Sequence, residues 1–123
     1  MQYANLNIMF KFRINPHWEI TRGSGQALDT SVLLALLRAI EETGSIARAA
    51  QVVGLSYRYA WGLLRDAEEL FGYSLMQTGR GRGTQLSPLA EKLIWADRRI
   101  AARLSPTLDS LASELEAELG KPA

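Results

Sequence analysis

Arginine and aromatic side chains recur at helical spacing within residues 56–65 of this 123-residue chain. Tyr57, Trp61 and Arg65 follow one another at intervals of four and so share one face of a helix, with Arg58 on the adjacent row. A guanidinium group pairs bidentately with guanine, and hydroxyl groups at the first turn of a helix suit phosphate oxygens. The pattern predicts a DNA-contacting surface in which Arg58 reaches base edges. Its members are Ser56, Tyr57, Arg58 and Arg65.

The same face has a second interpretation, in which the arginines are solvated surface charges and the aromatic rings only pack. We favour packing against a neighbouring hairpin for Trp61, and DNA contact for Tyr57 and Arg58 because they stand at the exposed start of the helix. Acidic residues are missing from residues 43–65 and from residues 70–90. The local absence of carboxylates favours binding of a polyanionic partner. The arginines in these two windows, all of which we expect to contact DNA, are Arg48, Arg58, Arg65, Arg80 and Arg82.

A glycine-rich loop, GRGRG at residues 79–83, carries Arg80 and Arg82. It could suggest the nucleotide-binding loop of an enzyme, but it lacks the Gly-Lys-Ser/Thr ending of such loops. The flanking residues 74–77 and 84–86 are typical of a β-hairpin. We therefore expect a wing whose two arginines contact phosphate or the minor groove, with a solvated turn as the alternative.

Composition argues against several other classes of function. The chain has no cysteine and a single histidine, so we predict no catalytic residue, no metal site and no cofactor. No apolar run approaches the roughly 18 residues of a membrane span, and the first ten residues lack the features of a signal peptide. The protein is expected to be soluble and cytoplasmic.

Three short helices are predicted to position the arginine face. Apolar residues recur at helical spacing after Asp29, after Ser45 and after Ser56. Asp29 or Thr30 is the expected N-cap of the first helix, and Ser45 and Ser56 are the expected N-caps of the other two. A glycine follows each run, at residues 44, 54 and 72. Alanines in the second helix let it approach the third closely, which is typical of a helix-turn-helix.

The N-terminal part of the chain has the alternation of a strand. Apolar and polar residues alternate over residues 8–14, are interrupted by Asn15-Pro16, and alternate again over residues 18–20. This pattern predicts a half-buried strand. Residues 22–26, RGSGQ, are interpreted as a flexible connector.

Residues 88–119 carry a long amphipathic helical pattern that begins at Ser87-Pro88. We expect Ser105-Pro106 to kink or restart this helix, because proline has no N–H to donate. Its leucine stripe is too long to be buried on one small domain, so a second copy is the expected partner, with folding back on its own domain as the alternative. The expected dimer contacts are Leu93, Ile100, Leu104, Leu108, Leu111 and Leu115.

The run GSIARAAQVVGLSYRYAW, the GRGRG loop and the helix start LSPLAEKLIWA together resemble a known family. They are similar to the N-terminal domain of ModE-type molybdate-responsive regulators, which are akin to LysR-type winged helices, over about residues 10–119. The resemblance implies a dimeric transcription regulator that binds a palindrome-like operator. Family members continue into an oxyanion-binding module, so a molybdate-like effector is expected to act only through a C-terminal domain absent from this sequence. The implied DNA contacts are Ser56, Tyr57, Arg58, Arg65, Arg80 and Arg82.

The predicted fold is mainly α with a small β wing: a winged helix-turn-helix with an N-terminal strand segment and a long C-terminal dimerisation helix. We expect residues 1–26 to form the strand segment and connector, 27–87 the DNA-binding domain, 88–119 the dimerisation helix and 120–123 a tail. The predicted function is sequence-specific binding of double-stranded DNA by a homodimer in transcription regulation. A winged-helix module that binds protein without binding DNA is the alternative.

Overall fold

The structure is a computed structural model that describes residues 10–23, 25–78 and 83–120. Contacts group the chain into two compact units. One unit is His17–Arg98, and the other combines the described part of Met1–Pro16 with Arg99–Ala123. A long helix, α4 (Pro88–Leu119), contributes residues to both units.

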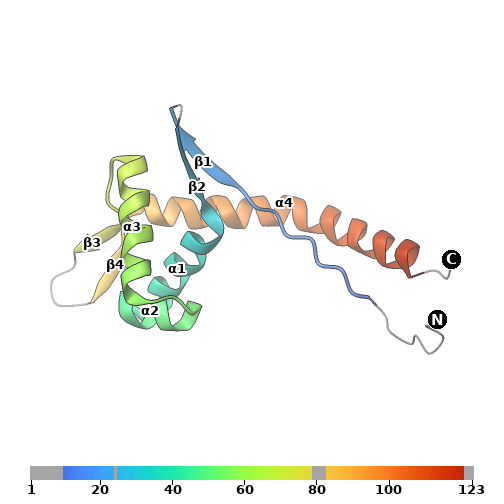
Figure 1. The fold of residues 1–123 in the computed structure, drawn as a ribbon, viewed down its shortest axis with the longest axis horizontal. Coiled ribbons are helices and arrows are strands. Elements are labelled where there is room, and N and C mark those ends of the chain that lie inside the picture. Colours follow the sequence, from blue (N-terminus) through green and yellow to red (C-terminus); the bar gives the residue numbers. More distant parts are fainter. Residues whose placement is uncertain (1–9, 24, 79–82, 121–123) are drawn as a thin grey trace. The chain divides into compact units, whose positions relative to one another are not determined.

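Three helices and the caps between them form the larger unit, as the sequence predicts. They are α1 (Thr30–Thr43), α2 (Ile46–Val53) and α3 (Tyr57–Phe71), and Figure 1 shows them gathered together. The side chains of Asp29, Ser45 and Ser56 accept hydrogen bonds from backbone N–H groups in the first turns of these helices. Glycine at residues 44, 54 and 72 adopts the left-handed conformation that ends each helix, which confirms the predicted boundaries.

The core of this unit lies between α1 and the elements that pack around it. Leucine and isoleucine side chains of α1 are fully buried, and the small side chains of Ala49 and Ala50 let α2 pack closely. The underside of α3 and the start of α4 complete the cluster. Its largest fully buried side chains include Leu33, Leu34, Leu36, Leu37, Ile40, Leu64, Leu75 and Ile94.

A short antiparallel hairpin precedes α1. It consists of β1 (Glu19–Arg22) and β2 (Gln26–Asp29), with Glu19 opposite Asp29 and Ile20 opposite Leu28. The predicted connector at residues 22–26 is therefore a hairpin turn, with Gly23 at a φ of 64°. Arg22 Nη1 donates to the Leu70 carbonyl at 2.9 Å, which ties the hairpin to the end of α3.

The predicted strand over residues 8–14 is wrong for its described part. Residues 10–18 form no strand, although side chains alternate between exposed and half-buried from Lys11 to Ile20; Phe10, expected on the buried side, is 59% exposed. No neighbouring strand pairs with this extended segment, and Pro16 lacks the N–H that a ladder would use. Instead, the N–H of Phe12 donates to Glu116 Oε2 at 2.7 Å, so the segment contacts the C-terminal part of α4 within the smaller unit.

The predicted hairpin after α3 is confirmed in its paired strands. β3 (Met76–Thr78) and β4 (Thr84–Leu86) are antiparallel and form the base of a wing. The N–H of Thr84 donates to the Gly44 carbonyl at 2.9 Å, which fixes the wing to the turn between α1 and α2. Arg80 and Arg82, predicted to contact DNA, lie outside the described residues.

The long helix α4 continues through Pro106, so the expected restart at that residue does not occur. The carbonyl of Ala102, which a proline at residue 106 cannot bond, belongs to an exposed residue where water can satisfy it. Ala90, Leu93 and Ile94, in the first part of α4, are buried in the core of the larger unit.

Candidate nucleic-acid interface

The exposed face of α3 is defined by the buried stripe on its other side. Ala60, Leu64 and Ala67 are almost completely buried against the core. At about 100° per residue, Gly62 lies about 200° around the helix from Ala60, and Arg58 and Arg65 lie on the same outward face. The packing of α3 therefore determines that the predicted arginine face is presented to the solvent.

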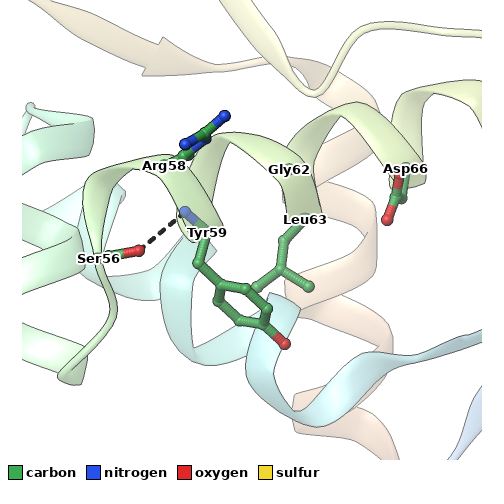
Figure 2. Close-up of a pocket in the computed structure, with 6 residues that line it drawn as sticks. All are labelled: Ser56, Arg58, Tyr59, Gly62, Leu63 and Asp66. Atoms are coloured by element: carbon green, nitrogen blue, oxygen red, sulfur yellow. Dashed lines mark hydrogen bonds between the residues drawn. The ribbon is translucent and has the colours of Figure 1, made fainter.

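The turn between α2 and α3 sets the start of this face. Gly54 adopts a φ of 75°, and the N–H of Leu55 donates to the Ala50 carbonyl at 2.8 Å. Ser56 then caps α3, since its Oγ accepts from the N–H of Tyr59 at 3.0 Å (Figure 2). This bond uses a lone pair of the hydroxyl and leaves its hydrogen able to donate to a phosphate oxygen.

Tyr57 and Trp61 form an aromatic pair on one flank of the face. Their ring centroids are 6.1 Å apart in an edge-on arrangement, with 54% of Tyr57 and 39% of Trp61 exposed. Among the described residues the aromatic partner of Trp61 is Tyr57 of the same helix, and the packing against the wing expected for Trp61 stays a prediction. Mutual contact limits the rotamers of both rings, which lowers the entropic cost of ordering the exposed Tyr57 side chain on a ligand.

A hollow of about 400 Å³ lies along one flank of the exposed face, between the row of Arg58 and Gly62 and the row of Tyr59 and Leu63. Figure 2 shows Arg58 and Tyr59 leaving the first turn of α3 in different directions, with Gly62 one turn further along. Sequence reasoning missed Tyr59 and Asp66, whose exposure and place on this face follow from the direction in which α3 packs. The lining residues are Ser56, Arg58, Tyr59, Gly62, Leu63 and Asp66.

The electrostatic character of the face is basic at its N-terminal end. Arg48, Arg58 and Arg65 are exposed, and within the part of the chain that the structure describes none of them is in an ion pair with a carboxylate. Asp66 is the first acidic residue along α3, and Glu68 is held away by hydrogen bonds from Ser74 and Leu75. The arrangement can receive a polyanion over its first half.

The residues expected at a dimer interface differ in exposure and fall into three groups. Leu93 is 8% exposed and packs in the core of the larger unit, so its surface is already covered within the subunit. Ile100 and Leu108 are half-buried. A stripe on α4 stays exposed, and we call it the leucine stripe: Leu104, Leu111, Leu115 and Leu119.

Other kinds of site are not found in residues 10–23, 25–78 and 83–120. No three histidine, aspartate or glutamate side chains are grouped there in a way that could hold a metal ion. Within the same ranges, no helix is both long enough and apolar enough to cross a membrane.

The amino-acid sequence of this chain is similar to those of several bacterial proteins. The chain is 45% identical over 73 residues to the "Molybdenum transport protein ModE" of Herbaspirillum seropedicae, covering 56% of this chain and 27% of that protein. It is 36% identical over 105 residues to the protein of the same name from Azotobacter vinelandii, covering 76% of this chain and 39% of that protein. It is also 31% identical over 85 residues to the "Transcriptional regulator ModE" of Yersinia pestis, covering 66% of this chain and 32% of that protein.

The chain thus spans about a third of the length of these relatives. Residues 32–91 match the family model described as the bacterial regulatory helix-turn-helix protein of the lysR family. That range runs from α1 to the first turn of α4 and includes α3 and the wing. The fold is a winged helix-turn-helix, and residues 32–91 are a regulatory helix-turn-helix domain of the LysR type.

Proposed function

We propose that this chain is the DNA-binding part of a transcription regulator and that it places α3 in the major groove of double-stranded DNA. The observation that carries the proposal is the outward face of α3, where Arg58 and Arg65 stand opposite a completely buried stripe. A helix presented in this way, after a tight glycine turn, has the shape that enters a major groove. The LysR-type domain and the printed name of the Yersinia pestis relative support a role in transcription.

Arg58 has the position of a base reader. It lies in the first turn of α3, whose N-terminal residues meet base edges when a recognition helix docks. Its guanidinium can donate two parallel hydrogen bonds to O6 and N7 of guanine. Ser56 and Tyr57 stand beside it, where their hydroxyl groups can hold phosphates and fix the register of the helix.

The wing is proposed to contact the DNA backbone. Its base is fixed to the α1–α2 turn through Thr84, so its position follows from the same packing that presents α3. Arg80 and Arg82 are proposed as phosphate or minor-groove contacts on the grounds of their type and their place in the sequence.

We propose that two copies associate through the leucine stripe. Leu104, Leu111 and Leu115 follow spacings of seven and four residues, so they form one seam along α4, and each is at least 40% exposed. A continuous apolar seam of this kind is typically covered by a partner, and an identical seam on a second copy is self-complementary about a two-fold axis. Such a dimer would bind two half-sites of a palindrome-like operator.

A bacterial regulator that binds chromosomal DNA must be in the cytoplasm, so we propose the cytoplasm as the location of this protein. No cofactor is assigned to the described residues, and a molybdate-like oxyanion is not proposed to bind them. Of the three relatives described above, molybdenum appears in the names of the Herbaspirillum seropedicae and Azotobacter vinelandii proteins only.

The proposal is tested by separating base reading from backbone binding. A duplex is first selected from randomised DNA with the wild-type protein, and its affinity is compared with that of a scrambled duplex at one salt concentration. Arg58→Ala is expected to cost about 1–3 kcal/mol on the selected duplex and little on the scrambled one. Arg80→Ala combined with Arg82→Ala should weaken binding to both duplexes alike.

Arg103→Ala is the matched control, because it removes the same charge from an exposed position on α4 outside the proposed interface. It should leave the ratio of the two affinities unchanged. The assignment of base reading to α3 is wrong if the wing variant lowers the ratio of selected to scrambled affinity while Arg58→Ala leaves that ratio unchanged.

A further inference from the structure

Gly62 stands where a glycine is energetically unfavourable for the helix itself. It lies in the interior of α3, away from both capping positions, and it has an ordinary helical conformation with no positive φ. Glycine in the interior of a helix is less favourable than alanine, since it loses more backbone freedom on folding. An interior glycine therefore calls for a reason in the surroundings of its Cα atom.

Packing within the chain does not supply that reason. A Cβ atom built on Gly62 has no atom within 4 Å, apart from its chain neighbours and the adjacent backbone of its own helix. Gly83 shows the opposite case, because a Cβ atom there would stand 2.8 Å from the Gly44 carbonyl oxygen. The fold excludes a side chain at Gly83 but leaves room for one at Gly62.

The space beside Gly62 opens outward. Gly62 lines the hollow on α3, at about 200° from the buried Ala60 and so near the centre of the face proposed to enter DNA. Arg58 stands one turn before it and Asp66 one turn after it, on adjoining rows of the same face. Gly62 is the one residue lining the hollow that has no side chain to fill it.

We infer that Gly62 is the point of closest approach between α3 and the floor of the major groove, where a base-pair edge enters the hollow. This inference rests on the proposed DNA binding and deepens it by naming a specificity-determining residue. A missing side chain lets the helix backbone come nearer to the base edges, so that Arg58 reaches them at hydrogen-bond distance.

The charges around the hollow favour a base edge over a phosphate group. Asp66 repels phosphate oxygens, whereas its carboxylate can accept hydrogen bonds from the exocyclic amino groups of cytosine or adenine. Arg58 on the other side offers donors to guanine. A base-pair edge carries both hydrogen-bond donors and acceptors, so it is the part of DNA that is complementary to Asp66 and Arg58 together.

The test is Gly62→Ala, which adds one methyl group to the hollow. The thermal midpoint should rise by about 2–8 °C, because alanine is the better helix former and nothing in the chain opposes it. Affinity for the selected duplex should fall by about 5- to 150-fold, as expected when a methyl group is forced into a close contact. Affinity for a scrambled duplex should change by less than about threefold, since non-specific binding rests on phosphate contacts.

Gly25→Ala is the matched control: it adds the same methyl group at an exposed glycine of the β1–β2 turn, where a Cβ atom also meets nothing within 4 Å. It should leave both affinities unchanged. A second variant, Asp66→Asn, should lower the ratio of selected to scrambled affinity if a base edge fills the hollow. An unchanged ratio for Asp66→Asn would overturn the choice of a base edge.

The outcomes separate this inference from the proposed function. If wild-type protein enriches no duplex and binds none, the proposed function itself fails. If wild-type protein binds its selected duplex and Gly62→Ala binds it equally well, DNA binding stands and the close approach at Gly62 is wrong. A fall in the thermal midpoint of Gly62→Ala would also overturn the inference, because it would show that the fold needs the glycine.

Discussion

The leucine stripe gives a quantitative prediction about assembly. Leu111 and Leu115 are 44% and 40% exposed in the single chain. Complete burial of a leucine contributes about 1.5–3 kcal/mol, so covering the exposed part of each contributes about 0.6–1.3 kcal/mol. In a two-fold dimer each residue occurs twice, and replacing both should remove about 2.5–5 kcal/mol of association free energy.

Leu111→Asp with Leu115→Asp is therefore expected to raise the dimer dissociation constant by about 50- to 5,000-fold, before any added cost of burying the new charges. Sedimentation over a concentration series measures this shift. The control pair is Ser113→Asp with Ala117→Asp, which places the same charges at the same spacing on exposed positions of the opposite side of α4.

The control variant should have the same sedimentation-derived average mass as the wild-type protein at each concentration. Equal masses for the leucine pair and the wild type at every concentration would refute the assignment of this stripe to a dimer interface. Circular dichroism of each variant shows that α4 is still helical, so that loss of the helix is not taken for loss of the interface.

Three further predictions concern the wing, the core and the DNA. Gly83→Ala should destabilise the larger unit by about 1–3 kcal/mol in urea unfolding, because its φ is 74° and a Cβ atom would meet Gly44; an unchanged midpoint would contradict this. Asp97→Ala should cost about 1–3 kcal/mol, since Asp97 accepts from Trp18 Nε1 at 2.9 Å and from Arg38; a variant as stable as wild type would show these bonds to be unimportant. The log–log slope of DNA affinity against salt should be about −5 to −9, and a flat response would exclude the proposed phosphate contacts.

Much of the larger unit could be predicted because its signals are local. The caps at Asp29, Ser45 and Ser56 and the glycines that follow each helix are short-range features, and the structure confirms each of them. Buried side chains of α3 follow directly from helical spacing. The same spacing is enough to place Arg58 and Arg65 on the exposed face.

The N-terminal part was less predictable, because its outcome depends on distant partners. Alternation correctly indicates half-buried side chains at Phe12 and Ile14, but Phe10 is exposed, and the backbone N–H of Phe12 donates to the Glu116 carboxylate and not to a strand. Alternation at residues 18–20 correctly indicated β1, but β2 and its pairing with β1 were missed, since β2 is short and directly precedes the N-cap of α1. Pairing of this kind is decided by packing on the rest of the unit.

The hollow on α3 could not be predicted from residue types. It depends on the absence of a side chain at Gly62 together with the directions that Tyr59 and Asp66 take around the helix. The contact between Tyr57 and Trp61 differs in this respect, because their spacing of four residues already makes the two side chains neighbours on the helix. Which neighbours surround an exposed position is a property of the folded chain.

The central claim is that this chain recognises a DNA sequence through α3, and one measurement tests it most directly. Fluorescence anisotropy at a single, near-physiological salt concentration compares the affinity of the wild-type protein for the duplex that it selects from random DNA with its affinity for a scrambled duplex. We predict a preference of about 10³-fold or more for the selected duplex. Equal affinity for both duplexes, within a few-fold, would contradict the claim.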